Sequence, residues 1–233
     1  MSTNNKNNNN DNGTFISRQI AVYKTDKKLI EFIDKLNPAP ITTYAHLHAQ
    51  ADDAGEGRKV YSNIGIVLQD YSAGTGDKTI RLTVNISPDE AEYIYSKVKI
   101  GIKEFEFSLS KIFGKPDENG YATATKLTIT RGILDEEKKP LRYPWCVDAM
   151  IGRGIPEKNQ TGGTYCQKNS FKCDKQVKVY LVDIDFFKLM NRVSSYIRVW
   201  ESQYGASLMI TGRNAVEEQM NALKGAGNNE QAG

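Results

Sequence analysis

The chain has 233 residues and a formal net charge of +3, from 31 basic and 28 acidic residues. This length can bury a substantial core, as one large domain or two small ones. The small charge excess does not by itself indicate a nucleic-acid-binding protein. The sequence shows no N-terminal signal and no apolar run near the ~20 residues that span a bilayer. We therefore expect a soluble cytoplasmic protein with no membrane partner.

Both ends are expected to lie outside the folded body. Residues 1–13 form a polar, asparagine-rich tract, a composition typical of disordered tails. Residues 212–233 predict a flexible C-terminal tail with at most one short amphipathic helix. The folded body is therefore expected to comprise residues 14–211.

The first half of this body, residues 14–101, begins with mixed patterns. Residues 15–24 and 58–69 predict strands, and residues 41–50 predict a further extended segment. Residues 27–36 predict a short helix, because their apolar side chains recur at spacings of three and four. Those side chains are Leu29, Ile30, Ile33 and Leu36.

Residues 78–101 then predict a strand that leads directly into a helix. Apolar side chains alternate along residues 80–86, which is the period of a strand. Ser87, Pro88 and Glu90 follow as a capping box with a proline in the first turn, which indicates the start of a helix.

The second half, residues 102–211, begins with three predicted strands. They cover residues 104–113, 121–131 and 141–151, where apolar and polar side chains largely alternate. Pro144 interrupts the last of these strands or places it at a sheet edge.

A long polar segment, residues 152–175, precedes the last strand and helix, and it predicts a loop with one short hairpin around residues 165–173. Residues 176–182 alternate as a strand, and Asp183 supplies an N-cap carboxylate. The amphipathic helix that follows is predicted to stop at Gly205.

The repeated strand-into-helix unit suggests an internal duplication. Each half is predicted to hold three or four strands and then one helix, without the alternating pattern of a parallel sheet. The predicted fold class is therefore α+β, with two repeated antiparallel β-meander-plus-helix units packed as one pseudo-dimeric domain. The two units are residues 14–101 and 102–211.

This order of elements resembles the Whirly family of single-stranded-DNA-binding proteins and the related positive-cofactor-four type of domain. The resemblance covers about residues 15–204 and rests on element order, matched best at residues 80–86 and 177–181 with their helices. The short lysine-rich strand signature of plant Whirly proteins is missing. The resemblance implies that single-stranded nucleic acid binds along exposed sheet faces, with the helices packed on the inner side.

A sheet that binds single strands needs aromatic side chains for base stacking and cations for phosphates on its outward face. Residues 138–178 hold nine basic residues against three acidic ones. This segment and the outward strand positions supply the candidate nucleic-acid-binding residues, which are Arg142, Tyr143, Trp145, Arg153, Lys158, Tyr165, Lys168, Phe171, Lys172, Lys178, Tyr180, Arg81 and Lys126.

Each candidate also has a plainer explanation. Aromatic residues on strands, such as Trp145 and Tyr180, often fill a core or an edge. Lysine and arginine at outward positions are often ordinary solvated surface. The concentration of positive charge in residues 138–178 favours the binding interpretation.

The sequence predicts no catalytic residue, metal site or cofactor. His46 and His48 alternate, but no third ligand stands at metal-binding spacing. The three cysteines are expected to be reduced thiols. Residues 74–79 lack the glycine that precedes the lysine of a phosphate-binding loop, and a predicted strand follows them instead of a helix.

We therefore expect a non-catalytic single-stranded-DNA-binding protein with weak sequence specificity, acting in replication, recombination or the processing of phage or plasmid DNA. Binding of RNA and assembly into homo-oligomers stay open. The alternative is a protein-interaction, structural or inhibitor protein of a phage or mobile element that binds no nucleic acid. An enzyme is the third alternative.

Overall fold

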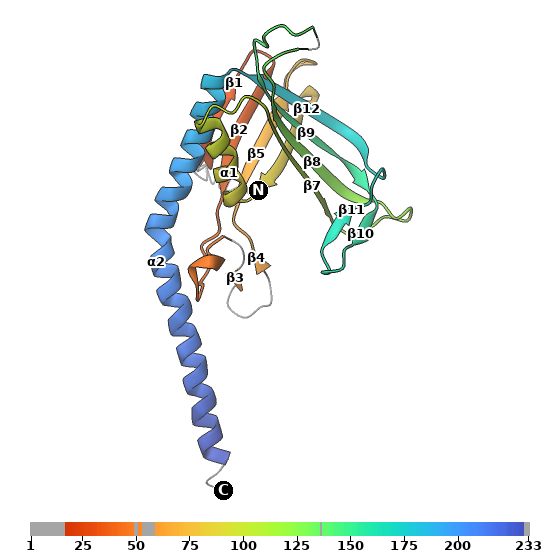
Figure 1. Ribbon diagram of the computed structural model, residues 1–233. Helices are drawn as coiled ribbons and strands as arrows, with labels where there is room; N and C mark the ends of the chain where they lie inside the picture. The colour runs from red at the N-terminus through yellow and green to blue at the C-terminus, as the bar shows by residue number, and fades with distance from the viewer. Residues whose placement is uncertain (1–16, 49–50, 53–58, 136, 231–233) are drawn as a thin grey trace, which may run out of the picture.

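The computed structural model describes residues 17–48, 51–52, 59–135 and 137–230 and has an α+β fold (Figure 1). The described part contains two four-stranded sheets, two two-stranded ribbons and two α-helices. All strand pairs are antiparallel. The predicted α+β class is confirmed at this level. The asparagine-rich tract at residues 1–13 lies outside the described residues.

The first sheet has the strand order β1-β2-β5-β6. Its strands are β1 (Gln19–Lys24), β2 (Lys28–Lys35), β5 (Asn63–Asp70) and β6 (Ile80–Ile86). Each strand pairs with the next one along the chain, apart from a short ribbon inserted between β2 and β5. The predicted strands near the chain start and at residues 80–86 are confirmed.

The helix predicted over residues 27–36 is wrong, because this segment forms β2 in the interior of the first sheet. The spacing of the apolar residues in β2 fits the period of a helix as well as that of a strand. Ile30 and Phe32 lie two apart and are fully buried, whereas Leu29 and Ile33 alternate onto the opposite face. Pairing with β1 and β5 satisfies the backbone groups of the strand on both sides, and this tertiary context overrides local propensity.

Short elements fill the connections of the first half. They are the 3₁₀-helices η1 (Tyr44–His46) and η2 (Gly76–Lys78), and the ribbon strands β3 (Ala51–Asp52) and β4 (Lys59–Val60). The strand predicted over residues 41–50 is wrong in its described part, which forms bends, turns and η1. Residues 58–69 correspond to β4 and most of β5.

Helix α1 (Pro88–Lys99) begins as predicted. The Ser87 Oγ accepts a hydrogen bond from the Glu90 N–H at 3.1 Å, and the Ser87 N–H donates to the Glu90 carboxylate at 2.7 Å. This reciprocal capping box satisfies two backbone donors that the first turn would otherwise leave without a partner.

The second sheet has the strand order β7-β8-β9-β12. Its strands are β7 (Phe105–Phe113), β8 (Ala122–Arg131), β9 (Trp145–Gly154) and β12 (Lys172–Leu181). The ribbon β10 (Pro156–Lys158) and β11 (Thr164–Cys166) lies between β9 and β12. The predicted strands are confirmed, but the hairpin predicted around residues 165–173 lies earlier in the chain.

Helix α2 (Asp183–Glu230) is 48 residues long and runs past both sheets (Figure 1). The predicted stop at Gly205 is therefore wrong, and residues 212–230, predicted as a tail with at most one short helix, continue α2. Gly205 and Gly212 are seven residues apart and so share one side of the helix. The side chains of Tyr44 and Leu47 lie against Gly205, and the Ile41 backbone lies against Gly212. Because the two glycines have no side chains, the segment before β3 can pack closely against α2.

One core joins both halves of the chain. Inward side chains of both sheets, the apolar face of α1 and the first half of α2 form a single buried cluster. Tyr196 of α2 donates a hydrogen bond to Asp34 of β2 at 2.8 Å, and burial with this bond raises the pKa of Tyr196 to about 12. Tyr95 of α1 donates to Asn191 of α2 at 2.8 Å. Full burial of each large apolar side chain stabilises the fold by about 1.5–3 kcal/mol.

Candidate functional site

The strands of the second sheet divide their side chains between two faces. The inner face carries Trp145, Val147, Val179 and Leu181, which are buried in the core. The residues between them point the other way. We call this other side the outer face. Its first row, taken across the strands β12, β9, β8 and β7, is Tyr180, Cys146, Thr130 and Glu106.

The next row of the outer face is Lys178, Asp148, Thr128 and Ser108. The Lys178 Nζ lies 3.2 Å from the Asp148 carboxylate. The side chain of Gln176 also donates to both Asp148 oxygens, at 2.9 Å each. The hydrogen bond from Lys178 to Asp148 raises the pKa of Lys178, so this lysine stays charged but is partly neutralised by its neighbour.

Lys126 and Phe171 mark the opposite end of the outer face. Lys126 shares a row with Gln176 and Met150, and its Nζ lies 4.3 Å from the centre of the Phe171 ring. Phe171 is half-buried in the connection just before β12. Among the described residues, no acid forms an ion pair with Lys126 within 4.0 Å. Its charge is therefore available to a ligand.

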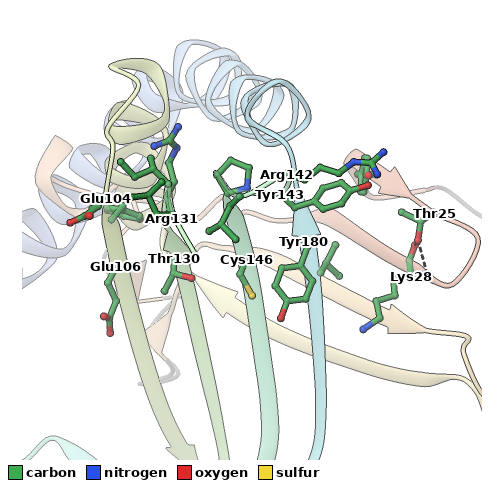
Figure 2. Close-up of a pocket in the computed structure, with 18 residues that line it drawn as sticks. Thr25, Lys28, Glu104, Glu106, Thr130, Arg131, Arg142, Tyr143, Cys146 and Tyr180 are labelled. Carbon is green, nitrogen blue, oxygen red and sulfur yellow. Dashed lines mark hydrogen bonds between the residues drawn. The ribbon is translucent and has the colours of Figure 1, made fainter. Parts of the chain in front are cut away.

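A groove of about 1230 Å³ begins at the first row of the outer face (Figure 2). It adjoins the loop formed by the described residues 132–135 and 137–144, which we call the overhanging loop. Backbone hydrogen bonds from Gly132 to Pro144 and from Leu141 to Ile133, both 3.0 Å long, close the base of this loop. Apolar side chains of the loop form the groove wall, namely Ile133, Leu134, Leu141 and Pro144.

Aromatic and cationic side chains stand at the β12 end of the groove. Tyr143 and Tyr180 are 40% and 51% exposed. The Arg142 guanidinium lies 5.3 Å from the centre of the Tyr143 ring. Lys28 reaches in from β2, where its Nζ donates to the Lys178 carbonyl at 2.9 Å and lies 3.3 Å from Asp70. The groove thus joins the two halves of the chain.

Trp145 is not a stacking platform, which corrects the sequence prediction. Its side chain is 1% exposed, and its ring centre lies 4.5 Å from that of Phe186. The indole N–H donates to Asp183 at 2.8 Å, and Arg131 binds the same carboxylate at 2.9 Å. These bonds, led by that from Arg131, lower the pKa of Asp183. Trp145 therefore anchors α2 to the sheet and is closed to a base.

The remaining basic candidates do not gather on the outer face. Arg153 and Lys172 pair across strands on the side opposite to Tyr180, and Lys172 lies over the Tyr121 ring at 4.3 Å. Arg81 belongs to the first sheet, 3.8 Å from Glu31. The exposed residues Lys158, Tyr165 and Lys168 belong to the β10–β11 ribbon or follow it directly. The basic segment predicted over residues 138–178 is therefore spread over several surfaces.

Sequence reasoning missed Lys28 and Glu106 as groove residues. Lys28 falls in the segment that was predicted as a helix, so the sequence pattern does not place it beside the strands of the second half. Glu106 alternates with the buried side of β7, which gives its face but not its neighbours. Only the order of strands and the crossing of the two sheets bring these residues to one groove.

The described residues contain no cluster of three or more His, Cys, Asp or Glu side chains able to hold a metal ion. All three cysteines are free thiols. Burial, with a contribution from Asp148, raises the pKa of the Cys146 thiol in the groove floor, which disfavours the nucleophilic thiolate. His48 contacts Glu201 at 2.9 Å and packs on Trp200. None of the helices in the described part of the chain has the length and apolar character that a bilayer crossing requires.

Comparison with protein-family models, curated proteins and solved structures finds no match for the chain. The functional argument therefore rests on the residues themselves. The outer face offers exposed rings, cations at both ends and an adjoining groove with an apolar wall. Such a surface is able to bind planar, negatively charged ligands.

Proposed function

We propose that the protein binds single-stranded nucleic acid, DNA in the first place, along the outer face of the second sheet, without catalysing a reaction. One observation carries the proposal: Tyr180 and Tyr143 present exposed rings beside the cations Arg142 and Lys28, at the mouth of the groove. Rings and cations together match the two parts of a single strand, its bases and its phosphates.

The energetics favour unpaired strands over duplexes. Stacking contributes about 1–3 kcal/mol per base and needs a base face that is free of its neighbours. Two tyrosines and Phe171 would therefore supply a few kcal/mol. The cations add binding that weakens with salt, because each neutralised phosphate releases counterions. Stacking and phosphate contacts read no base identity, so weak sequence specificity is expected.

The arrangement of elements supports a repeated architecture of the Whirly-like kind. Each four-stranded sheet pairs its strands in chain order, and a helix follows each sheet. We propose that residues 14–101 and 102–211 are two copies of one ancestral unit, packed as a pseudo-dimer. The overhanging loop belongs to the second copy, so the binding surface is assigned to that copy. Replication, recombination or the processing of phage or plasmid DNA is the proposed setting.

Fluorescence anisotropy of a labelled thirty-nucleotide single strand of mixed sequence tests this function. The protein should bind the single strand tightly at low salt and much more weakly at moderate salt. A matched duplex should bind far less well, and a matched RNA strand shows whether DNA is preferred. Equal binding to duplex and single strand would contradict the stacking part of the proposal, and no binding at low salt would remove it.

A second function, protein interaction, is favoured by the last part of α2. Val216, Met220 and Leu223 are exposed there at spacings of four and three, so they form one apolar stripe. Arg213, Glu217 and Lys224 flank the stripe on one side, so it has the apolar centre and charged border of helices that pair with a second copy.

We therefore propose a second copy of this chain as the partner of the stripe. Light scattering after size-exclusion chromatography should give a dimer mass that Met220→Glu converts to a monomer mass. Ser207→Glu, on the same helix but away from the stripe, is the control. A monomer in the unaltered protein would leave the stripe to a different protein partner and overturn this assignment.

A further inference from the structure

The charges in the groove follow a fixed order from one end to the other. Glu104 and Glu106 lie at the β7 end together with Arg131, whose guanidinium binds Asp183, and Lys28 and Arg142 lie at the β12 end (Figure 2). Thr130 and Cys146 lie between the two ends. A ligand in the groove thus meets an acidic side and a basic side.

The dimensions of the groove suit a nucleotide with its base toward the acidic end. Neighbouring strands lie about 4.8 Å apart, so three spacings put the Glu106 and Tyr180 backbones about 14 Å apart. This distance leaves room for one nucleotide between the two ends. A phosphate attached to that base would extend toward Arg142 and Lys28, since these are the cations on the Tyr180 side.

The acidic end can distinguish bases by their hydrogen-bonding groups. A glutamate carboxylate only accepts hydrogen bonds. Ser108 donates to one Glu106 oxygen at 3.2 Å, and no described residue donates to the other oxygen. Cytosine, adenine and guanine carry exocyclic amines that donate to such an oxygen. Thymine and uracil have no exocyclic amine, and their single ring N3–H lies between two carbonyls that repel a carboxylate.

We propose that the groove reads one base of the bound strand and selects bases that bear an exocyclic amine over thymine and uracil through Glu106. Thr130 and Cys146 support the base from the sheet, and the apolar wall of the overhanging loop closes the other side. This inference rests on the proposed single-strand binding and adds a base preference to it. The rest of the outer face contributes affinity without reading sequence.

The test compares oligo-dC and oligo-dT of twenty nucleotides at pH 8, where cytosine is uncharged. One hydrogen bond gained by the cytosine amine predicts about threefold to tenfold tighter binding of oligo-dC. Glu106→Gln should bring the ratio of the two affinities close to one, because the amide both donates and accepts. Glu118→Gln removes the same charge from the loop between β7 and β8 and should leave the ratio unchanged.

The outcomes separate this inference from the proposed function. Equal, salt-sensitive binding of both oligonucleotides would overturn the base preference and leave single-strand binding intact. A dC preference that survives Glu106→Gln would also overturn it, since Glu106 would not be the reader. Absence of binding to either oligonucleotide and to mixed-sequence strands would remove the function and the preference together.

Discussion

The inner and outer faces of the second sheet are built from alternate residues of the same strands, yet one face is buried in the core and the other is exposed to solvent. On the inner face, Trp145 and Leu181 are buried against α2. On the outer face, Tyr180 and Lys178 alternate with Leu181 and Val179 along β12 and stay in contact with solvent. Successive positions of a strand alternate between the two faces. The position of an aromatic ring along the strand therefore decides whether it is buried in the core or exposed for binding.

The difference between Tyr143 and Trp145 is instructive. They are two residues apart, but β9 begins only at Trp145, so Tyr143 belongs to the overhanging loop. Pro144 lies between them at the loop base. The strand turns the indole into the core, whereas the loop leaves the phenol at the groove. Chain position alone would give both rings the same role.

The largest expected effect is on the inner face. Trp145→Ala removes a fully buried indole together with its bond to Asp183, and it should reduce the free energy of unfolding by about 3–5 kcal/mol. Urea denaturation followed by circular dichroism measures this. A loss of stability below about 1 kcal/mol would contradict the assignment of Trp145 to the buried core.

On the outer face, Tyr180→Ala should reduce single-strand affinity about fivefold to a hundredfold, the equivalent of about 1–3 kcal/mol of lost stacking. Its free energy of unfolding should change by less than about 0.5 kcal/mol. Tyr93→Ala on α1 removes a tyrosine that is 50% exposed, like Tyr180, and serves as the matched control. Equal binding losses in both variants would show that the outer face has no special role.

Arg142→Gln should lower the dependence of binding on salt. Removing one phosphate contact reduces the slope of log affinity against log salt by about 0.7 for a single strand. Arg81→Gln, on the first sheet beside Glu31, should leave the slope unchanged. Anisotropy titrations at four salt concentrations measure both slopes. A larger change for Arg81 than for Arg142 would move the binding surface to the first sheet.

The smallest effect concerns acid stability. The pKa of Asp183 is lowered by Arg131 in the folded state, so its charged form stabilises the fold above the ordinary aspartate pKa of about 4. That stability is lost as pH falls through the ordinary value toward the folded one. Asp183→Asn should therefore be less stable than the unaltered protein at pH 7, and the difference should shrink below about pH 4. A constant difference would contradict the assignment.

Much of the fold could be predicted because strand alternation and helix capping are local signals. The capping box of α1 and the alternation of β6 each lie within a few residues. The identity of β2 could not be predicted, since Ile30 and Ile33 fit a helix as well as a strand. Pairing with its neighbours β1 and β5 makes this segment a strand. Gly205 likewise looked like a helix stop, whereas its role is close packing against Tyr44 and Leu47.

The candidate site was predictable only in part. Alternation gave the outward direction of Lys178, Tyr180 and Lys126, because direction depends on one strand alone. The count of positive charges could not show that Arg153 and Lys172 alternate onto the other face. Lys28 enters the groove from a strand about 150 residues before β12, a contact with no local signal.

Photo-crosslinking tests the central claim most directly. A single strand that carries 5-iodo-2′-deoxycytidine at several positions would be bound at low salt and irradiated, and the crosslinked peptides would be mapped by mass spectrometry. The account predicts crosslinks at Tyr180, Tyr143 and Phe171, on the outer face and its groove. Crosslinks confined to the first sheet or to α2 would contradict it.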